Sequence, residues 1–164
     1  MTTSVSDLIS NREDGHQSFV TFRVADHLFG VPVMRVQDIL TPHAIAPVPG
    51  GPREVRGLIN LRGRIVTVVD MRTRLSLPPR DGGAKGAGMC VTVECSGEYY
   101  TLFVDAVGDV VTLSPNLREQ NPSTLDQVWK AVAEAVYRTD EGLLIALDID
   151  QLLALEPSAS SGRQ

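Results

Sequence analysis

Histidine and cysteine, the residue types that most often bind metals or act as nucleophiles, are scattered through this sequence. His16, His27 and His43 fall in an N-terminal tail, a turn and a loop, with no cysteine or carboxylate at metal-ligand spacing. Cys90 and Cys95 lie in one predicted strand at positions of opposite parity, so their side chains point to opposite faces and cannot pair with each other. The sequence therefore predicts no metal site and no disulfide between these cysteines.

Motifs for catalysis and phosphate binding give no support to an enzyme. The serines do not stand in a Gly-x-Ser-x-Gly elbow, and the glycines at 82–88 lack the Gly-Lys-Ser/Thr sequence of a phosphate loop. Glycine outside that context is typical of a flexible connector. Catalysis therefore finds little support in the sequence.

Arginine at a predicted turn is better suited to binding than to catalysis. The segment 60–64, Asn-Leu-Arg-Gly-Arg, is predicted to join two strands, because Gly63 tolerates the positive φ of a tight turn. Arg62 would then point outward or across a seam, toward a carboxylate or a helix C-terminus. An exposed turn arginine is ordinarily solvated and contributes little, and we keep that interpretation for Arg64.

Composition narrows the class of partner. The net charge of -5 and the pI near 5.1 disfavour a nucleic-acid binder, because phosphate affinity needs a basic surface. Arg53, Arg56, Arg62 and Arg64 leave an oligonucleotide-binding barrel as an alternative, but aromatic residues make up only 5% of the chain and give few stacking platforms.

The sequence shows no segment suited to a membrane. No apolar stretch approaches the roughly 20 residues that a spanning helix needs. Residues 1–17 lack the basic start and apolar core of a signal peptide. We expect a cytoplasmic protein without direct membrane insertion.

Short apolar runs predict a mainly β protein. The predicted strands end at turn residues, and Pro32, inside one of them, requires an edge position or a bulge. These strands cover 19–24, 28–36, 64–70, 89–95 and 99–104.

The two halves of the chain repeat the same plan. A shift of about 71 positions lays Val20, Phe22 and Val24 over Val91, Val93 and Cys95, and carries residues 36–39 onto 107–110. A later shift of about 78 positions aligns residues 65–70 with 143–148. Inward parity is preserved by both shifts, which indicates a structural repeat.

The repeat predicts two small five-stranded antiparallel β-barrels, with one or two short helices. We expect a flexible N-terminal tail over 1–16, one barrel over roughly 17–77, a linker over 78–88, a second barrel over 89–156 and a flexible C-terminal tail over 157–164. Residues 123–132 are predicted to form a helix capped by Ser123, with Trp129 in its apolar stripe.

The tips of the two repeats carry opposite charge. Where the first half has Arg62 and Arg64, the second has Asp140 and Glu141. Similar scaffolds with oppositely charged tips could face two different partners or join copies head to tail. Asp140 and Glu141 therefore mark a possible second partner surface.

Three segments together resemble the CheW family of chemotaxis coupling proteins. They are Phe29–Ile39, Val55–Arg72 and Leu102–Val110, and the run Gly-Leu-Ile-Asn-Leu-Arg-Gly at 57–63 is the most specific. The resemblance spans roughly residues 18–155. It implies two five-stranded barrels around a common core, and a protein that has no catalytic activity and needs no cofactor.

The resemblance also implies a function and a site. A protein of this family would couple the cytoplasmic tip of methyl-accepting chemoreceptors to the regulatory domain of the histidine kinase CheA, at membrane-associated receptor arrays. A receptor helix would bind the first-half surface in a helix-in-groove mode. The residues implied are Val33, Val36, Asp38, Ile39, Gly57 and Arg62.

Overall fold

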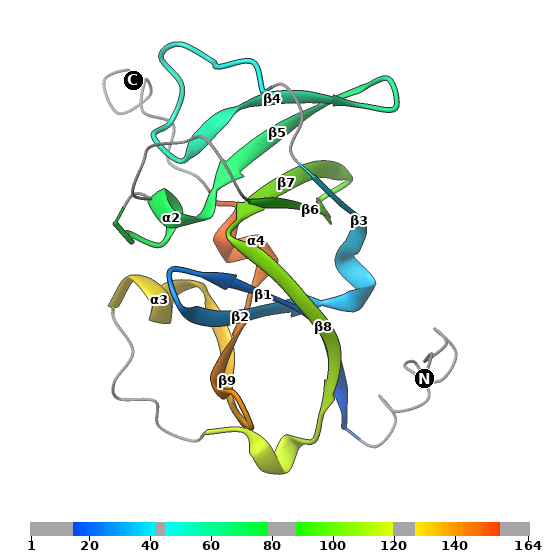
Figure 1. The fold of residues 1–164 in the computed structure, drawn as a ribbon, viewed down its shortest axis with the longest axis vertical. Coiled ribbons are helices and arrows are strands. Elements are labelled where there is room, and N and C mark those ends of the chain that lie inside the picture. Colours follow the sequence, from blue (N-terminus) through cyan, green and yellow to red (C-terminus); the bar gives the residue numbers. More distant parts are fainter. Residues whose placement is uncertain (1–14, 42–44, 79–87, 120–126, 155–164) are drawn as a thin grey trace.

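The chain forms two five-stranded sheets and a few short helices (Figure 1). The structure, a computed structural model, describes residues 15–41, 45–78, 88–119 and 127–154. The strands are β1 (Gln17–Val24), β2 (His27–Pro32), β3 (Val36–Leu40), β4 (Val55–Leu61), β5 (Arg64–Asp70), β6 (Met89–Cys95), β7 (Glu98–Val104), β8 (Ala106–Leu113), β9 (Ala133–Thr139) and β10 (Gly142–Leu147). The helices are α2 (Met71–Arg74), α3 (Gln127–Val132) and α4 (Ile149–Leu152), with 3-10 turns at Val33–Arg35 and Pro115–Leu117.

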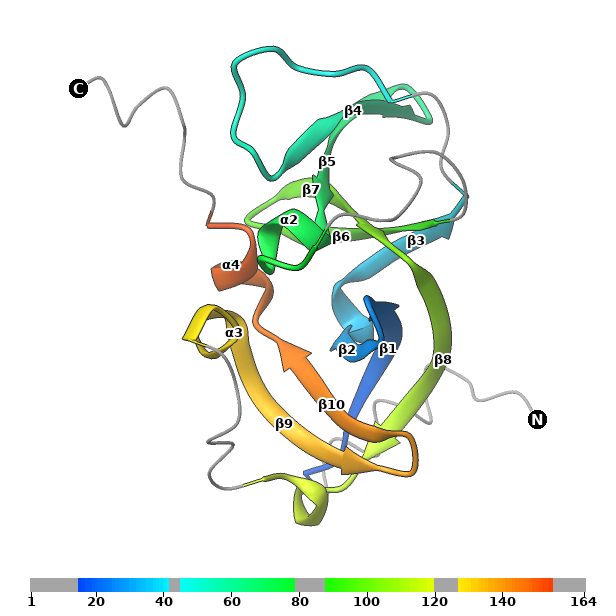
Figure 2. The same cartoon turned by 60° about the vertical axis from the view of Figure 1, so that its left-hand side comes forward.

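The strand order in each sheet defines two subdomains. Sheet 1 runs β8-β1-β2-β10-β9 and sheet 2 runs β3-β6-β7-β5-β4. Figures 1 and 2 show them as two layers, with α2 and α4 beside the junction. The mainly β prediction is confirmed, but the sheets are mixed, because β10 pairs with β2, and β5 with β7, in parallel.

The strands do not group by sequence halves as 17–77 and 89–156. Sheet 1 takes β1 and β2 from the first half but β8, β9 and β10 from the second, and sheet 2 combines β3, β4 and β5 with β6 and β7. The exchange begins at Pro32, the last residue of β2. Although β2 is a central strand, its pairing with β10 stops at Gly30, so Pro32 has a strand neighbour on the β1 side alone, as at an edge. The 3-10 turn that follows carries the chain from sheet 1 to sheet 2.

The internal repeat is confirmed by the strand registers. Val20 lies opposite Val110 in sheet 1, and their equivalents Val91 and Ile39 lie opposite each other in sheet 2. The registers of the two hairpins also agree along their full length, since each residue pair of β4 and β5 has its repeat equivalent in β9 and β10. The first half therefore places its third to fifth strands, β3, β4 and β5, in sheet 2 beside β6 and β7. The second half places its third to fifth strands, β8, β9 and β10, in sheet 1 beside β1 and β2.

Each sheet curls and is closed by a bridge rather than by a ladder. In sheet 2, Ala46 and Leu58 exchange two backbone hydrogen bonds of 2.9 and 2.8 Å. In sheet 1, Arg118 bridges Tyr137 at the equivalent place. Among the described residues no ladder joins β3 to β4 or β8 to β9, so the predicted barrels are incompletely closed.

A shared core lies between the sheets, as the family resemblance implied. Alternation along β1 places Val20, Phe22 and Val24 in this core, and the Trp129 ring packs against it. The Trp129 indole N–H donates to the Leu75 carbonyl at 2.9 Å, so α3 is tied to the loop after α2. Each sheet also encloses a small core of its own; sheet 1 buries Phe19, Leu28, Leu113, Tyr137, Leu144 and Ala146, and sheet 2 buries Ile59, Val66, Val68, Cys90 and Phe103.

Several expectations concern segments outside the described residues. They are the tails before 15 and after 154, the linker apart from Pro78 and Gly88, and the predicted helix start at Ser123. Cys90 and Cys95 are both free and lie on opposite faces of β6, as predicted. No helix among the described residues is both long and apolar enough to span a bilayer.

Candidate functional site

The surface that the sequence singled out is formed by one edge of sheet 2 and the tip of the β4–β5 hairpin. Val33 and Val36 are half-buried and pack against the shared core. Ile39 is 40% exposed on β3. Met34, which the sequence did not single out, is 51% exposed in the 3-10 turn. The edge strand therefore presents an apolar strip whose base is anchored in the core.

Asp38 and Arg62 are brought together across the two edges of sheet 2. Arg62 Nη1 lies 2.9 Å from Asp38 Oδ2, although β3 and β4 stand at opposite ends of the strand order. The Arg62 side chain is 82% exposed and that of Asp38 is 26% exposed. The guanidinium is thus held over the edge strand while most of its donors face solvent.

The local sequence of the hairpin explains where Arg62 lies. Arg62 and Gly63 have φ of 52° and 86°, the left-handed values of a type I′ turn. The Asn60 side-chain oxygen accepts the Gly63 backbone N–H at 2.9 Å and fixes the turn. The predicted tip at 60–64 is present with positive φ at Gly63.

Gly57 permits the close approach of another backbone segment. A β-carbon at this position would lie 2.4 Å from the Ala46 carbonyl oxygen, and φ is 154°. The approaching segment belongs to this chain and forms the bridge that closes sheet 2. Gly57 therefore lets the Ala46 segment pack closely against β4 at this edge of sheet 2.

Other arginines of the basic stripe are engaged within the chain. Arg56 pairs with Asp70 at 3.1 Å and lies 4.2 Å over the Phe103 ring. Arg64 lies 4.7 Å over the Tyr99 ring. These contacts reduce the free basic surface that the oligonucleotide-binding alternative needs.

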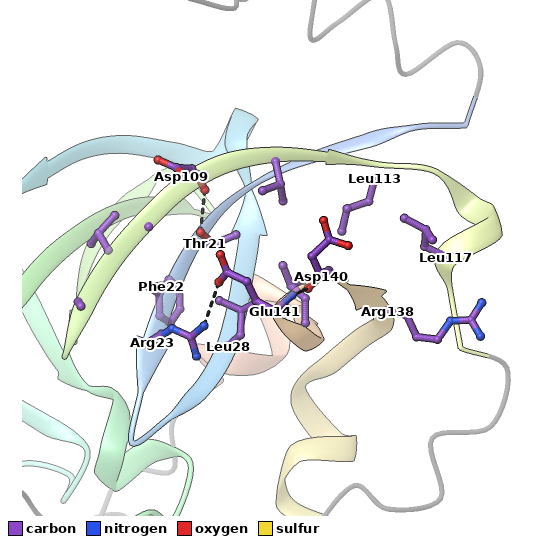
Figure 3. A pocket seen from close by; sticks show the side chains of 16 residues that line it. Thr21, Phe22, Arg23, Leu28, Asp109, Leu113, Leu117, Arg138, Asp140 and Glu141 are labelled. Atoms are coloured by element: carbon purple, nitrogen blue, oxygen red, sulfur yellow. Dashed lines mark hydrogen bonds and ion pairs between the residues drawn. The ribbon is translucent and has the colours of Figure 1, made fainter. Parts of the chain in front are cut away.

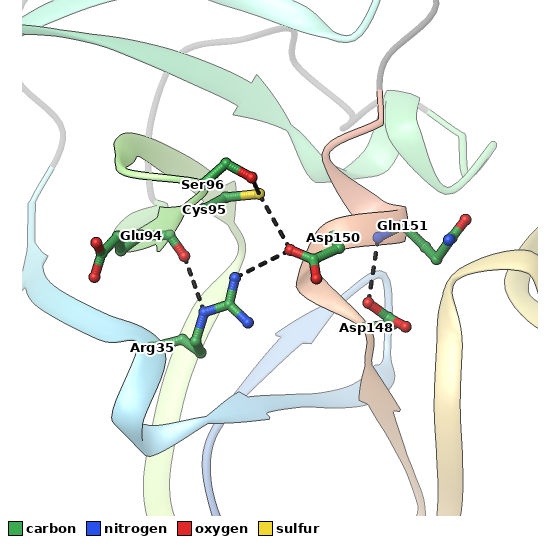
Figure 4. Close-up of polar contacts among 7 residues, drawn as sticks. All are labelled: Arg35, Glu94, Cys95, Ser96, Asp148, Asp150 and Gln151. Carbon is green, nitrogen blue, oxygen red and sulfur yellow. Dashed lines mark hydrogen bonds and ion pairs between the residues drawn. The ribbon is translucent and has the colours of Figure 1, made fainter.

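Arg35 fixes the turn that carries the apolar strip (Figure 4). Its Nε donates to the Glu94 carbonyl at 3.0 Å, and its Nη2 lies 3.2 Å from Asp150 Oδ1. The Cys95 thiol also donates to Asp150, at 3.4 Å. Burial and the Asp150 carboxylate raise the pKa of Cys95, so this thiol stays protonated beside the acid.

Asp140 and Glu141 form the β9–β10 tip of sheet 1, apart from the Asp38–Arg62 surface. Glu141 pairs with Arg23 at 2.9 Å. The hairpin registers make Asp140 the equivalent of Arg62 and Glu141 the equivalent of Gly63, so the predicted charge reversal falls on equivalent positions only at Arg62 and Asp140.

Exposed aliphatic residues also occur at equivalent positions of the two sheets. Ile39 and Ile65 are 40% and 66% exposed in sheet 2, and their repeat equivalents Val110 and Leu143 are 48% and 42% exposed in sheet 1. Sequence reasoning missed Met34, because the prediction of an unbroken strand over 28–36 left no place for the 3-10 turn that exposes it. It missed Ile65, because the apolar run at 64–70 suggested a strand buried on both faces. The parity of Ile65 relative to Val66 and Val68 could have indicated its exposure.

Within the ranges that the structure describes, no three His, Cys, Asp or Glu side chains gather in a way that could hold a metal ion.

Comparison with known proteins agrees with this geometry. The family model for the CheW-like domain matches residues 18–156. The chain belongs to the CheW-like domain family. It is 23% identical over 150 residues to a probable chemotaxis protein CheW of Rhizobium etli, covering 92% of this chain and 96% of that protein. A chemotaxis protein CheW of Rhizobium meliloti is 26% identical over 143 residues, which cover 87% of this chain and 91% of that protein.

A solved CheW structure shows the same fold. The scaffolding protein TtCheW from Thermoanaerobacter tengcongensis matches with a TM-score of 0.74 and 27% identity, over 85% of this chain and 99% of that one. The resemblance read from the sequence is therefore confirmed at the level of family and fold.

Proposed function

We propose that this chain is a non-enzymatic chemotaxis adaptor that couples the cytoplasmic tip of chemoreceptors to the regulatory domain of the histidine kinase CheA. Family membership supports the adaptor role, because the named relatives are chemotaxis proteins and a scaffolding protein. The adaptor would be cytoplasmic, would be recruited to membrane-associated receptor arrays, and would bind neither nucleic acid nor the membrane directly.

The observation that carries the receptor site is the Asp38–Arg62 pair flanked by exposed aliphatic side chains. A helix laid along β3 would cover Ile39 and Met34 and would bring its own polar groups to the free donors of Arg62. Val33 and Val36 support the strip from below. Gly57 holds the opposite edge close through the Ala46 bridge.

Sheet 1 supplies the second surface, for the kinase. Val110 and Leu143 repeat the exposed aliphatic positions of sheet 2, while Asp140 and Glu141 reverse the charge of the tip. Charge complementarity selects partners and orients them, so the two sheets would select different proteins. Holding both partners in fixed positions lets the adaptor bias the kinase between its active and inactive arrangements.

A second candidate function is an adaptor of a chemotaxis-like pathway whose output is not flagellar. The same fold and surfaces serve both, so the identity of the co-purified receptor and kinase decides between them. An oligonucleotide-binding function is disfavoured by the internal contacts of Arg56 and Arg64. A salt-sensitive gel shift would revive it.

A pull-down with a receptor cytoplasmic fragment and the CheA regulatory domain tests the proposal. The wild-type chain should capture both, and Arg62→Ala should lose the receptor while keeping the kinase. Arg64→Ala is the matched control, since it removes an arginine from the same turn. Capture of neither partner by the folded wild type would overturn the adaptor function.

A further inference from the structure

Two ion pairs cross the junction between the sheets, and the internal repeat relates them. The shift of about 78 positions that aligns β5 with β10 also lays Arg72 in α2 over Asp150 in α4. Arg72 pairs with Asp105, the residue between β7 and β8, where the chain passes from sheet 2 to sheet 1. Asp150 pairs with Arg35, the last residue of the 3-10 turn by which the chain passes from sheet 1 to sheet 2. A helix thus contacts a crossing segment twice, with the charges reversed.

The second pair lies beside the surface that the proposed function assigns to the receptor. Arg35 stands between Met34 and Val36, which both belong to the apolar strip. Figure 4 shows its guanidinium between β6 and α4. Its Nε donates to the Glu94 carbonyl of β6 at 3.0 Å, and its Nη2 lies 3.2 Å from Asp150 Oδ1. One side chain therefore ties the turn both to sheet 2 and to the helix that follows the last strand of sheet 1.

The 3-10 turn has little support of its own. The Val36 N–H donates to the Val33 carbonyl and closes the turn, none of whose three residues is fully buried. Among the residues that the structure describes, no side chain caps the beginning of the turn at Pro32. The orientation of the exposed Met34 side chain therefore depends on how its neighbour Arg35 is held.

Helix α4 gives the Asp150 carboxylate a fixed position. Ile149 and Leu152 of this helix are buried in the shared core. Arg74 of α2 donates from Nε to the Leu152 carbonyl at 2.6 Å and from Nη2 to the Gln151 carbonyl at 3.0 Å. Packing and hydrogen bonds thus both hold α4 at the junction, so its carboxylate can orient a side chain from another segment.

We propose that Asp150 is a positioning residue for the receptor surface and acts on the apolar strip through Arg35. Its carboxylate holds the guanidinium against β6 and so fixes the 3-10 turn before a helix docks on Met34. A turn that is already ordered in the free protein removes an entropic cost of binding. The receptor as the docking partner rests on the proposed function, whereas the positioning of the turn does not.

The same pair contributes little to the stability of the fold. The Arg35 and Asp150 side chains are 35% and 68% exposed, so water screens their attraction. Loss of the Asp150 charge should therefore leave the urea midpoint close to that of the wild type. This separates the positioning of the turn from a general structural role.

Hydrogen exchange of the Val36 amide tests the positioning without any partner, because its hydrogen bond closes the turn. Asp150→Asn keeps the shape of the side chain without its charge and should speed this exchange about threefold to tenfold. Asp150→Glu, which keeps a carboxylate, should restore the slow rate. Arg35→Gln should also speed the exchange, although a purely electrostatic effect on the rate would have opposite signs in the two charge-removing variants. An unchanged Val36 rate in Asp150→Asn would overturn the proposal.

The matched control removes a carboxylate from a different ion pair of the same length. Glu119 pairs with Arg138 at 3.2 Å, and Arg138 lies on β9, where it lines a pocket of sheet 1 (Figure 3). Glu119→Gln should leave the Val36 exchange rate unchanged. Equal acceleration by Glu119→Gln and Asp150→Asn would show that the effect is not specific to the turn and would overturn the proposal.

Calorimetry with the receptor cytoplasmic fragment and the CheA regulatory domain tests the consequence for binding. Asp150→Asn should bind the receptor fragment about threefold to tenfold more weakly, with kinase affinity unchanged, and Asp150→Glu should restore the affinity. Equal losses for both partners, or unchanged receptor affinity despite faster Val36 exchange, would overturn the role in receptor binding. A folded wild type that binds no receptor fragment would overturn the proposed function, while the Val36 rates would still decide whether Asp150 positions the turn.

Discussion

Arg72 and Asp105 form a two-point ion pair between the sheets. Arg72 Nη2 lies 2.6 Å from Asp105 Oδ2, and its Nε donates to Oδ1 at 3.2 Å. Asp105 also accepts the Ala25 N–H in the β1–β2 turn of sheet 1, while Arg72 lies in α2 at the end of β5 of sheet 2. The hydrogen bond to Asp105 raises the pKa of Arg72, so the charge of the guanidinium is secure.

Removing Arg72 should destabilise the whole domain. The two side chains are only 20% and 19% exposed, so Arg72→Ala removes both guanidinium contacts that Arg72 makes to a largely buried carboxylate. We expect a loss of about 2–4 kcal/mol in the free energy of unfolding, measured by urea denaturation. Arg53→Ala, at an exposed position, should cost less than about 0.5 kcal/mol. A loss for Arg72→Ala as small as that of the control would show that the pair does not hold the sheets together.

The repeat could be predicted from the sequence because apolar alternation survives in both halves. Local patterns define strands and their inward faces, but they do not define which strand pairs with which. The exchange of strands between sheets was therefore not predicted. It depends on the short 3-10 turn after Pro32, and the sequence of that turn is equally compatible with one continuous strand through Val33 and Val36. The parallel pairs β10–β2 and β5–β7 follow from that exchange.

The candidate site was predictable in its parts but not in its assembly. Gly63 marked the turn and Gly57 marked a close approach, since both need backbone freedom that side chains restrict. The contact between Asp38 and Arg62 depends on the curl of a five-stranded sheet that brings its two edges together. No spacing along the chain encodes that curl.

Gly57 and Gly63 should respond differently to alanine, although both have positive φ. A β-carbon at Gly57 would collide with the Ala46 carbonyl oxygen, whereas none of the surrounding atoms lies within 4 Å of one at Gly63. We expect Gly57→Ala to cost about 2–4 kcal/mol and Gly63→Ala about 1 kcal/mol of unfolding free energy. Chemical denaturation measures both, and equal losses would show that the Ala46 segment yields without cost.

Arg62→Ala should leave the stability of the fold almost unchanged. The Arg62 side chain is 82% exposed, and exposed ion pairs contribute little because water screens them. We expect a change below about 0.5 kcal/mol in the free energy of unfolding. Any loss of receptor capture by this variant then reports on the surface and not on folding. A thermal shift of several degrees would instead show that the pair closes sheet 2.

Alkaline pH should destabilise the protein through Cys90. Burial raises the pKa of this thiol from 9.0 to about 11, against a smaller opposing effect of Arg56. Above pH 9 the unfolded thiol loses its proton while the native one keeps it, so stability is fully present below pH 9 and declines as the pH rises toward 11. The decline attributable to this group is about 2–3 kcal/mol.

Cys90→Ala isolates that contribution. The variant should be less stable than wild type at pH 7, because it loses buried volume inside sheet 2, where Cys90 is 0% exposed. Its urea midpoint should nevertheless fall less steeply between pH 9 and pH 11, so the two stability curves converge. Other groups with raised pKa, such as Tyr137, titrate in both proteins and cancel in the comparison. Parallel curves would mean that the thiolate is tolerated within sheet 2, through local opening or through closer contact with Arg56.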